Sequence, residues 1–555
     1  MRQYSFRTIS SEHPLKTHLV MALLMACPTT LWAGESVQSG RPEAKPAADA
    51  AGSTLSDAAW QTLRRQAVER PRRIIFNNDG NEPVYFCKAA TAEELLKART
   101  SRLAGSQVDS IFYCTWSSGF GLFTHNTKAG QVFSTREAMF KDNRTQEFLD
   151  RKLDPLQVMA DFAHQHGMEL FWSMRMNDTH DGAGADYGPV MFRANRLKQE
   201  HPEWLIGSKE HPPRHGAWSA VDYGVPEIRD LAFRYCAEVC RNYQVNGIEL
   251  DFFRHAFFFR CSGRGEPCGD AELDQMTALV RRIRAATEEA GRKCNRPILL
   301  AVRVPDSTDY CRLIGIDLER WLREGLVDLL IVSGYTQLNP WEYSVQLGHR
   351  YGVKVYPSLD EPRVRDEGAR KLRGTPAAYR GRALNVWHAG ADGVYLFNFF
   401  DPASSLWREL GDPAGLRKLE RTYFASVRGV GSMPVPHQKF LRVPTLNPAS
   451  PVSVAAGKPG RVVFRVGEDF AGAGEPARIC LRLRFKNMPA AGQFHGSLNQ
   501  QPLSNGEIRD VWMEYQLNAK ALCAGINLLE VSCADSPAGP FSLLDLCIEV
   551  TPAED

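Results

Sequence analysis

The chain has 555 residues, 43% hydrophobic and 24% charged, an ordinary globular composition that excludes a disordered chain and allows two domains. Its formal net charge of +3 is too small for this length to suggest nucleic acid or an anionic membrane as the partner. Beyond the amino-terminal segment, no apolar stretch approaches the ~20 residues of a membrane span, so no transmembrane segment is expected.

The first 33 residues have the pattern of a secretory signal peptide. Three basic residues precede an apolar run at 19–26, and the following residues suit cleavage after Ala33. We therefore predict export to the periplasm or the extracellular space. Alternatively, residues 24–27 (Leu-Met-Ala-Cys) resemble a lipobox, which would leave a lipid anchor on Cys27.

The thirteen cysteines also bear on the compartment. Without Cys27 their number is even, which is consistent with disulfides in an oxidising environment. Cys261 and Cys268 flank a glycine-containing loop and are the pair that we expect to be bonded.

Alternating strands and helices are predicted from residue 71 to 426, after a linker and a short helix at 34–70. The β-rich apolar runs are 74–77, 110–116, 169–177, 247–254, 298–304, 328–333, 353–359 and 394–399. The amphipathic stretches near helical spacing are 91–103, 154–165, 226–242, 270–290, 317–324, 341–351 and 376–388. Eight strands alternating with helices predict an α/β fold, a (β/α)8 TIM barrel. A doubly wound sheet is the alternative, disfavoured because no Gly-rich phosphate turn follows the first strand.

The carboxy-terminal part has a different pattern. Residues 427–451 are rich in proline and predict a linker. Residues 452–555 contain alternating polar and apolar segments without helical periodicity, which predicts a small β-sandwich. We expect this domain either to bind carbohydrate or to brace the barrel.

The strand within residues 245–255 carries two carboxylates, Glu249 and Asp251, at a two-residue interval. In a strand that interval places both on one face, which must point into the barrel when the other face packs against helices. Ionised groups are costly in a dry core unless they are paired or reach water. The strand is therefore predicted to form the floor of an active site.

Several other predicted strands end in polar side chains. Because the carboxyl ends of barrel strands form the catalytic face, these ends should converge on one site. They are Asn77-Asn78-Asp79, Arg175-Met176-Asn177-Asp178, Arg303, Asp360-Glu361, Asn398 and Asp401. The long segment 178–226, rich in His, Gly, Pro and Trp, is predicted to build a wall of that site.

Two segments carry a family resemblance. Residues 218–229 read Trp-Ser-Ala-Val-Asp-Tyr-Gly-Val-Pro-Glu-Ile-Arg, and residues 246–254 read Asn-Gly-Ile-Glu-Leu-Asp-Phe-Phe-Arg. Together they are similar to the bacterial glycosyl-hydrolase-like TIM barrels over roughly residues 72–425. In that family a Trp/Asp/Pro-Glu-Val-Arg segment opens the helix before a Val-Asp-Gly-Ile-x-x-Asp fourth strand.

The resemblance implies a (β/α)8 fold and hydrolysis of glycosidic bonds, with some members acting on cell-wall glycans. It maps the family's carboxylate on the fourth strand to Asp251. The chain departs from the pattern at Phe252, where many members carry a second Asp, and at Arg254 and His255. These departures leave the substrate open.

Glycoside cleavage requires two carboxyl groups, one acid and one nucleophile or base. We predict Asp251 as the nucleophile or base, although it could instead be an ion-pair partner that buttresses the barrel. Glu361 is the preferred leaving-group acid because the seventh strand lies opposite the fourth, and Asp178 is a competing choice. Asp360 lies beside Glu361 at the end of the same strand, and Asp306 and Asp401 are further competing choices. For any one of these carboxylates, including Glu361 and Asp178, the alternative is a solvated loop carboxylate.

Substrate contacts are predicted from the neighbouring side chains. Arg175 and Arg303 would keep Asp251 ionised, and Glu249 would pair with an arginine. Arg254 and His255 could bind an anionic substituent such as sulfate or uronate. The predicted set is completed by Asn177 and Asn398 and by the aromatic residues Trp116, Trp218 and Tyr335, which stack on sugars or else belong to the core.

The histidines lack metal-site spacing, so no metal or other cofactor is predicted. Serine-esterase and phosphate-loop motifs are also missing from the sequence. The sequence therefore predicts an exported glycoside hydrolase that acts on a polysaccharide or glycan. The alternatives are a non-catalytic glycan-binding TIM-barrel protein and a polysaccharide lyase.

Overall fold

The computed structural model describes residues 55–428, 433, 435–455, 458–470, 478–487, 494–533 and 541–553. The predicted signal peptide, the alternative lipid anchor at Cys27 and nearly all of the first linker lie outside these residues. They therefore stay predictions.

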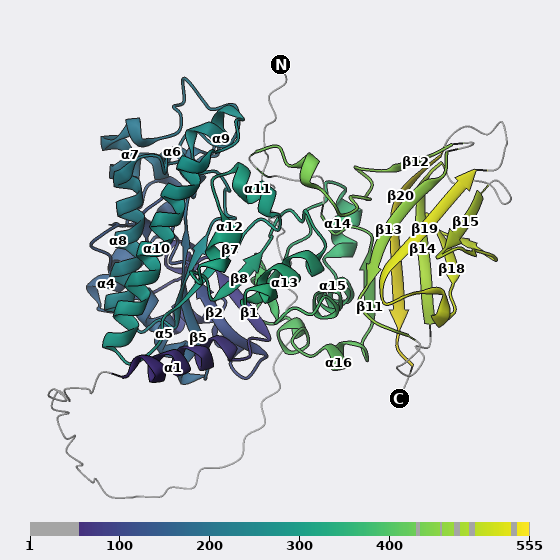
Figure 1. The fold of residues 1–555 in the computed structure, drawn as a ribbon, viewed down its shortest axis with the longest axis horizontal. Helices are drawn as coiled ribbons and strands as arrows, with labels where there is room; N and C mark the ends of the chain where they lie inside the picture. Colours follow the sequence, from purple (N-terminus) through teal and green to yellow (C-terminus); the bar gives the residue numbers. More distant parts are fainter. Residues whose placement is uncertain are drawn as a thin grey trace, which may run out of the picture. The chain divides into compact units, whose positions relative to one another are not determined.

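Eight parallel strands close into a barrel, in the order β1-β2-β5-β6-β7-β8-β9-β10 and back to β1 (Figure 1). Their bounds are β1 Ile74–Asn78, β2 Val108–Tyr113, β5 Glu169–Arg175, β6 Gly247–Asp251, β7 Leu299–Val304, β8 Leu329–Val332, β9 Lys354–Asp360 and β10 Val394–Phe397. Each strand overlaps one of the eight predicted runs. The prediction of a (β/α)8 barrel is confirmed.

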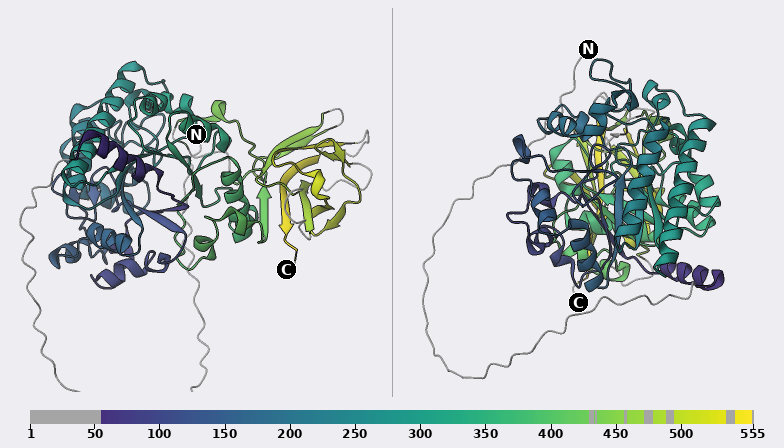
Figure 2. Two further views of the ribbon diagram at one scale, coloured as in Figure 1. Left: turned by 60° about the horizontal axis from the view of Figure 1, so that its bottom comes forward. Right: turned by 90° about the vertical axis from the view of Figure 1, so that its left-hand side faces the viewer.

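Helices surround the barrel strands, as the views in Figure 2 show. The longer ones are α1 Asp57–Glu69, α5 Pro155–Gln165, α6 Tyr187–Ala194, α8 Pro226–Asn242, α10 Asp270–Lys293, α13 Trp341–Arg350 and α15 Pro376–His388. The shorter ones are α2 Glu82–Tyr85, α3 Ala92–Lys97, α4 Thr145–Asp150, α7 Arg196–Glu200, α9 Arg260–Arg264, α11 Thr308–Leu313, α12 Leu318–Arg323, α14 Glu367–Arg373 and α16 Pro413–Leu416. Helices α5, α8, α15 and α16 begin with a proline, which fits the first turn because its missing N–H has no helical partner there. Helices α8 and α15 have the predicted bounds.

The barrel interior is packed with side chains from alternate strand positions. The interior cluster contains Ile75, Phe112, Phe171, Leu299, Ala301, Leu329, Ile331, Tyr356, Tyr395 and Phe397. On β6, Ile248 and Leu250 belong to the larger core cluster outside this set, while Glu249 is hydrogen-bonded to Tyr395 of the interior cluster. The two carboxylates of this strand therefore point inward, as their spacing predicted.

The carboxy-terminal strands form two antiparallel sheets, which confirms the predicted sandwich. One has the order β11-β20-β14-β18-β17, with β12 also paired to β20, and the other β13-β19-β15-β16. Their bounds are β11 Arg421–Phe424, β12 Val452–Val454, β13 Gly460–Val466, β14 Arg478–Lys486, β15 Phe494–Leu498, β16 Gln501–Pro502, β17 Glu507–Arg509, β18 Trp512–Gln516, β19 Gly525–Cys533 and β20 Phe541–Thr551. A small parallel pair, β3 Leu122–Phe123 and β4 Gln131–Val132, lies in the loop after β2. Strand β11 comes from the segment assigned to the barrel, and the predicted domain boundaries themselves stay a prediction.

The barrel and the sandwich are joined by a buried ion pair. Arg373 at the end of α14 donates two hydrogen bonds to Asp545 of β20, at 2.8 and 2.6 Å. Both side chains are buried. Helix α15 also packs along β11. This contact fits the expectation that the sandwich braces the barrel.

Two expectations about single segments can be compared with the structure. Cys261 and Cys268 are both free thiols, close enough to share a hydrogen bond, so the expected disulfide is not formed. Among the described residues, none of the helices combines the length and the apolar character needed to cross a bilayer.

Candidate active site

The Asp251 carboxylate accepts hydrogen bonds from a neighbouring arginine and from the backbone that follows it. Arg303 of β7 lies beside it in register and donates two hydrogen bonds, from Nε at 2.9 Å and from Nη2 at 2.6 Å. The backbone N–H groups of Phe253 and Arg254 donate to its Oδ1 at 3.0 and 2.9 Å. Only 1% of Asp251 is exposed. The expected water-reachable carboxylate is therefore not found here, and the geometry matches the alternative of a buttressing ion pair.

Glu249 lies deeper in the barrel and is fully buried. It accepts hydrogen bonds from the hydroxyl groups of Ser173 and Tyr395, the latter at 2.9 Å. Burial raises the pKa of Glu249 to about 7, although Arg303 opposes this shift. The expected arginine partner is replaced by two hydroxyl groups, and the side chain is out of a substrate's reach.

Asp178, the competing acid, is also fully buried. Its Oδ1 accepts from the backbone N–H groups of Gly119 and His180, and its Oδ2 lies 2.8 Å from His180 Nδ1 and 3.4 Å from Arg175 Nη1. Burial alone would raise the pKa of Asp178, but His180, His255 and Arg175 together hold it well below its ordinary value. Asp178 is therefore a fixed anion, unsuited to donating a proton.

The two neighbouring histidines have defined hydrogen-bonding roles. Arg254 Nη2, which can only donate, lies 2.8 Å from His180 Nε2, so this nitrogen accepts and His180 Nδ1–H donates to Asp178. The N–H of Thr179 donates to His255 Nδ1 at 2.9 Å. Burial and the Arg254 guanidinium lower the pKa of His255 well below its ordinary value. His255 Nδ1 thus accepts in this network, and His180 bridges Arg254 and Asp178.

Asp178, His180 and His255 place ligand atoms within 4.8 Å of one another, which is a spacing that a metal ion can use. However, the contacting atoms already accept hydrogen bonds from N–H groups, and the Arg175 and Arg254 guanidinium groups lie beside them. A metal cation would have to displace these donors and face two positive charges. The donor set fits a hydrogen-bonded network better than a metal centre.

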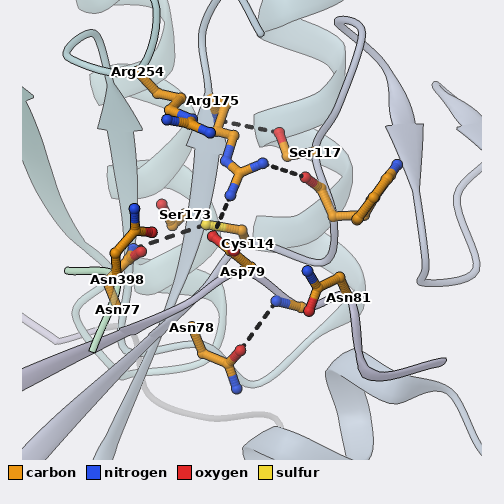
Figure 3. Close-up of polar contacts among 12 residues, drawn as sticks. Asn77, Asn78, Asp79, Asn81, Cys114, Ser117, Ser173, Arg175, Arg254 and Asn398 are labelled. Atoms are coloured by element: carbon orange, nitrogen blue, oxygen red, sulfur yellow. Dashed lines mark hydrogen bonds and ion pairs between the residues drawn. The ribbon is translucent and has the colours of Figure 1, made fainter. Parts of the chain in front are cut away.

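Asp79, one residue beyond β1, keeps partial contact with water, since 17% of its side chain is exposed. It pairs with Arg175 Nη2 (Figure 3). Burial opposes ionisation, but Arg175, Arg99 and Arg254 outweigh it and lower the pKa of Asp79. The sequence signal for Asp79 is the polar end of the first predicted strand, but the sequence-based prediction assigns the catalytic role to other carboxylates.

Arg175 is held by the loop after β2. Its Nη1 donates to the carbonyl of Trp116 at 3.2 Å, and its backbone N–H donates to Ser117 Oγ at 3.0 Å (Figure 3). Thr115, Trp116 and Ser117 all have positive φ angles, at 45°, 69° and 41°. Such strain in non-glycine residues concentrates at functional sites, where the surroundings fix an unusual backbone.

The predicted sugar-stacking tryptophans lie in aromatic clusters. Trp116 is buried and stacks on Phe133, with ring centroids 5.6 Å apart. Trp218 is half-buried, with Phe192 at 4.7 Å and the Lys209 ammonium 5.4 Å from its ring. The geometry of Trp116 matches the core alternative, whereas Trp218 contributes to the outer wall.

Asn177 also serves the wall. Its amide nitrogen donates to the carbonyls of Val221 and Phe257 at 2.9 and 2.6 Å, and its oxygen accepts from the N–H of Val221 at 3.0 Å. All its hydrogen-bonding groups are thus engaged. Asn177 ties two loops together behind the site and has no group left for a substrate.

Three predicted binding residues do come together, around Tyr335. Its hydroxyl group contacts Arg254 Nη1 and lies 3.1 Å from Asn398 Nδ2. The Arg363 guanidinium lies 3.7 Å above the Tyr335 ring and pairs with Glu361 at 2.6 Å. Glu361 is 51% exposed at its side chain. Arg254, Tyr335 and Asn398 thus lie side by side, and their role in binding a substrate stays a prediction.

The remaining candidate acids have structural contacts. Asp306 accepts from the N–H groups of Leu338 and Asn339, and burial raises its pKa to about 6. Asp360 is fully buried and pairs with Arg428. Asp401 is exposed and accepts from a backbone N–H two residues on. Among the described residues, no hydrogen bond or ion pair joins any of these three to Tyr335, Arg254 or Asn398.

Comparison with known proteins gives a partial match. No established family profile matches the chain. The Glycosyl hydrolase DigH of Escherichia coli (strain K12) is 28% identical over 99 residues, which is 18% of this chain and 22% of that protein, and the Shigella flexneri protein gives the same values. The match therefore spans about a fifth of the length of these relatives.

Solved structures with similar folds have low scores. Alpha-L-fucosidase isoenzyme 2 from Paenibacillus thiaminolyticus is 15% identical, covering 62% of this chain and 49% of its own, with a TM-score of 0.38. The glycoside hydrolase family 18 N-acetylglucosaminidase from Paenibacillus barengoltzii is 12% identical, covering 62% and 99%, with a TM-score of 0.34. Nothing about activity follows from likeness at this level. The DigH match and the barrel agree with the expected resemblance to glycoside-hydrolase-like TIM barrels.

Proposed function

We propose that the protein is an exported glycoside hydrolase that cleaves a polysaccharide or glycan at the carboxyl-end face of its barrel. The partial match to a glycosyl hydrolase supports the reaction class, and the amino-terminal pattern supports export. The single observation that carries the proposal is Asp79, an ionised carboxylate that keeps exposure to water amid arginines.

In this proposal Asp79 is the nucleophile or base, and Glu361 supplies the second carboxyl group. Asp251 and Asp178 become positioning residues, because both are buried and saturated with hydrogen bonds. Asp251 fixes Arg303 and the turn after β6, whereas Asp178 fixes the orientation of His180. Arg254, Tyr335 and Asn398 then form the binding surface beside Asp79.

The test is the release of reducing sugar from a panel of neutral and acidic polysaccharides. We expect Asp79→Asn and Glu361→Gln each to lower turnover by about 10²- to 10⁴-fold, the usual range for acid–base groups. Glu289→Gln, an exposed carboxylate on α10 paired with Lys293, is the matched control and should keep full activity. Unchanged turnover in Asp79→Asn would show that the reacting carboxylate lies elsewhere. Wild-type protein that binds a glycan without cleaving it would support the glycan-binding alternative.

A polysaccharide lyase is a second candidate, favoured by the contacts of Arg254. Its guanidinium contacts both His180 Nε2 and the hydroxyl of Tyr335. Elimination from a uronate requires a cation on the carboxylate, a base for the proton and an acid for the leaving oxygen, roles that Arg254, His180 and Tyr335 would fill. Lyase products absorb in the ultraviolet because they contain a new double bond. Ultraviolet absorption together with reducing ends would identify the lyase, and reducing ends alone the hydrolase.

A further inference from the structure

A cavity of about 80 Å³ lies where the barrel meets the sandwich, far along the chain from Asp79. Its walls come from the loop after β8, from α15, from β11 and from the segment after β11, including Thr336, Arg382, Asn385, Arg428 and His437. A water molecule takes about 30 Å³ in the liquid, so this volume holds a few waters or one small molecule.

Polar atoms without partners gather on this cavity. Within the described part of the chain, Arg382 Nε and Nη2, both ring nitrogens of His437, Asn385 Oδ1 and Thr336 Oγ1 are buried without a hydrogen bond. Arg382 and His437 are themselves more than nine-tenths buried. Leaving a buried polar group without a hydrogen bond is costly, so six such atoms on residues around one space indicate an occupant that satisfies them.

The charged groups around the cavity also favour an anionic occupant. Arg428 Nη2 donates to Asp360 Oδ1 at 2.6 Å, and Arg382 Nη2 lies 3.6 Å from the same oxygen. One carboxylate is therefore shared by two buried guanidinium groups. The nearby Arg465 is already paired with Glu342 at 3.3 Å. Arg428 is also close enough to the buried Asp306 carboxylate to interact with it, so Arg382 is the weakly paired cation. A buried cation without a close partner is costly, so an anion in the cavity would complete the contacts of Arg382.

We infer that this cavity binds a small oxyanion or carboxylate, held by the free N–H groups of Arg382 and by His437. The hydroxyl of Thr336 donates a further hydrogen bond. Asn385 Oδ1 accepts one from the ligand, which favours a small hydroxy acid over a fully ionised inorganic anion. Because the walls come from both domains, the ligand stabilises the junction between them. This site is independent of the proposed hydrolytic activity.

The test is the thermal unfolding midpoint of the full chain, titrated with glycolate, acetate or sulfate at constant ionic strength against chloride. A ligand that binds only the folded state raises the midpoint with its concentration. We expect a saturable rise of a few degrees in the wild type, and its loss in Arg382→Gln and in the milder Thr336→Val. Arg380→Gln on the same helix, whose side chain pairs with Glu409 outside the cavity, is the matched control and should keep the rise.

The arms also separate the possible ligands. A larger rise with glycolate than with sulfate identifies a hydroxy acid, and the reverse identifies an inorganic oxyanion. Isothermal titration of the wild type with glycolate and sulfate gives a direct reading even if Arg382→Gln fails to fold. No saturable rise and no binding heat with any anion would overturn the inference, because the cavity would then hold ordered water only. A rise in Thr336→Val and Arg382→Gln as large as in the wild type would also overturn it, because the anion would then bind elsewhere.

Discussion

The Asp251 carboxylate and the Arg303 guanidinium come from neighbouring strands, β6 and β7, and two hydrogen bonds join them inside the barrel. Removing one charge of a buried pair leaves the other without compensation, which typically costs about 3–5 kcal/mol. We therefore expect Asp251→Asn to lower the free energy of unfolding by that amount, as measured by urea denaturation.

The control for this change is Glu137→Gln, in an ion pair with Arg193 whose two side chains are both mostly exposed. Solvent screens such pairs, so stability should hardly change. If Asp251→Asn kept wild-type stability but lost all turnover, the carboxylate would be a reacting group rather than a buttress.

Glu249 should make stability depend on pH. Its pKa of about 7 in the folded protein lies above the ordinary value near 4.3, so the folded state binds more protons than the unfolded state between these values. Its contribution is therefore fully present below about pH 4 and is lost as the pH rises to 7, by about 3 kcal/mol in all.

Glu249→Gln keeps the hydrogen-bonding shape without the titration. We expect the unfolding free energy to fall more between pH 5 and pH 7 in the wild type than in this variant. Equal pH slopes in the two proteins would show that Glu249 titrates normally.

At the residue scale, the inward face and one charge partner could be predicted from the sequence. The two-residue interval correctly placed Glu249 and Asp251 on the inner face of β6, and Arg303 was correctly expected to pair with Asp251. The partner of Glu249, Tyr395, comes from β10 and depends on strand register, which a single sequence does not reveal. The ionised state of Asp79 could not be predicted either, because the arginines that keep it ionised are remote in the chain.

The turn between β1 and α2 shows how one element positions the site. Gly80 has a φ of +65°, and a Cβ atom there would lie 2.3 Å from the backbone nitrogen of Thr115. Gly80→Ala should therefore cost about 1–3 kcal/mol beyond the conformational penalty, by overpacking, and should displace the adjacent Asp79 and lower turnover.

Gly105 is the matched control because it has nearly the same φ, +69°, with open space around its Cβ position. Gly105→Ala should carry only the cost of a left-handed alanine, about 1–2 kcal/mol. Equal midpoints in chemical denaturation for the two variants would show that the turn yields without strain.

Elements were predictable where periodicity was long. Helices α8 and α15 have the expected bounds because a proline opens each, and α8 also carries an apolar stripe along its length. The stretch 91–103 was expected as one helix, but α3 ends at Lys97 and a separate 3₁₀ turn follows at 101–103. Short helices such as α6 and α7 in the wall were not predicted, because loop contacts rather than a repeating pattern stabilise them.

The junction between the barrel and the sandwich contributes to the stability of the whole molecule. The ion pair between Arg373 and Asp545 is buried, so Arg373→Met should destabilise the protein by about 3–5 kcal/mol. Arg461→Gln, in an exposed pair of the sandwich, should have little effect. Scanning calorimetry is the measurement, and a shift of equal size in both variants would contradict a bracing role for the junction.

Strand β11 has a practical consequence for anyone who separates the two halves. Its backbone pairs with β20 from Arg421 to Phe424, ahead of the proline-rich stretch that looks like a natural cutting point. A barrel fragment ending at residue 426 would keep β11 without its partner strand. The unpaired N–H and C=O groups of β11 would then favour aggregation with other molecules. A truncated barrel fragment should end before Arg421, and a fragment that carries the sandwich should begin there.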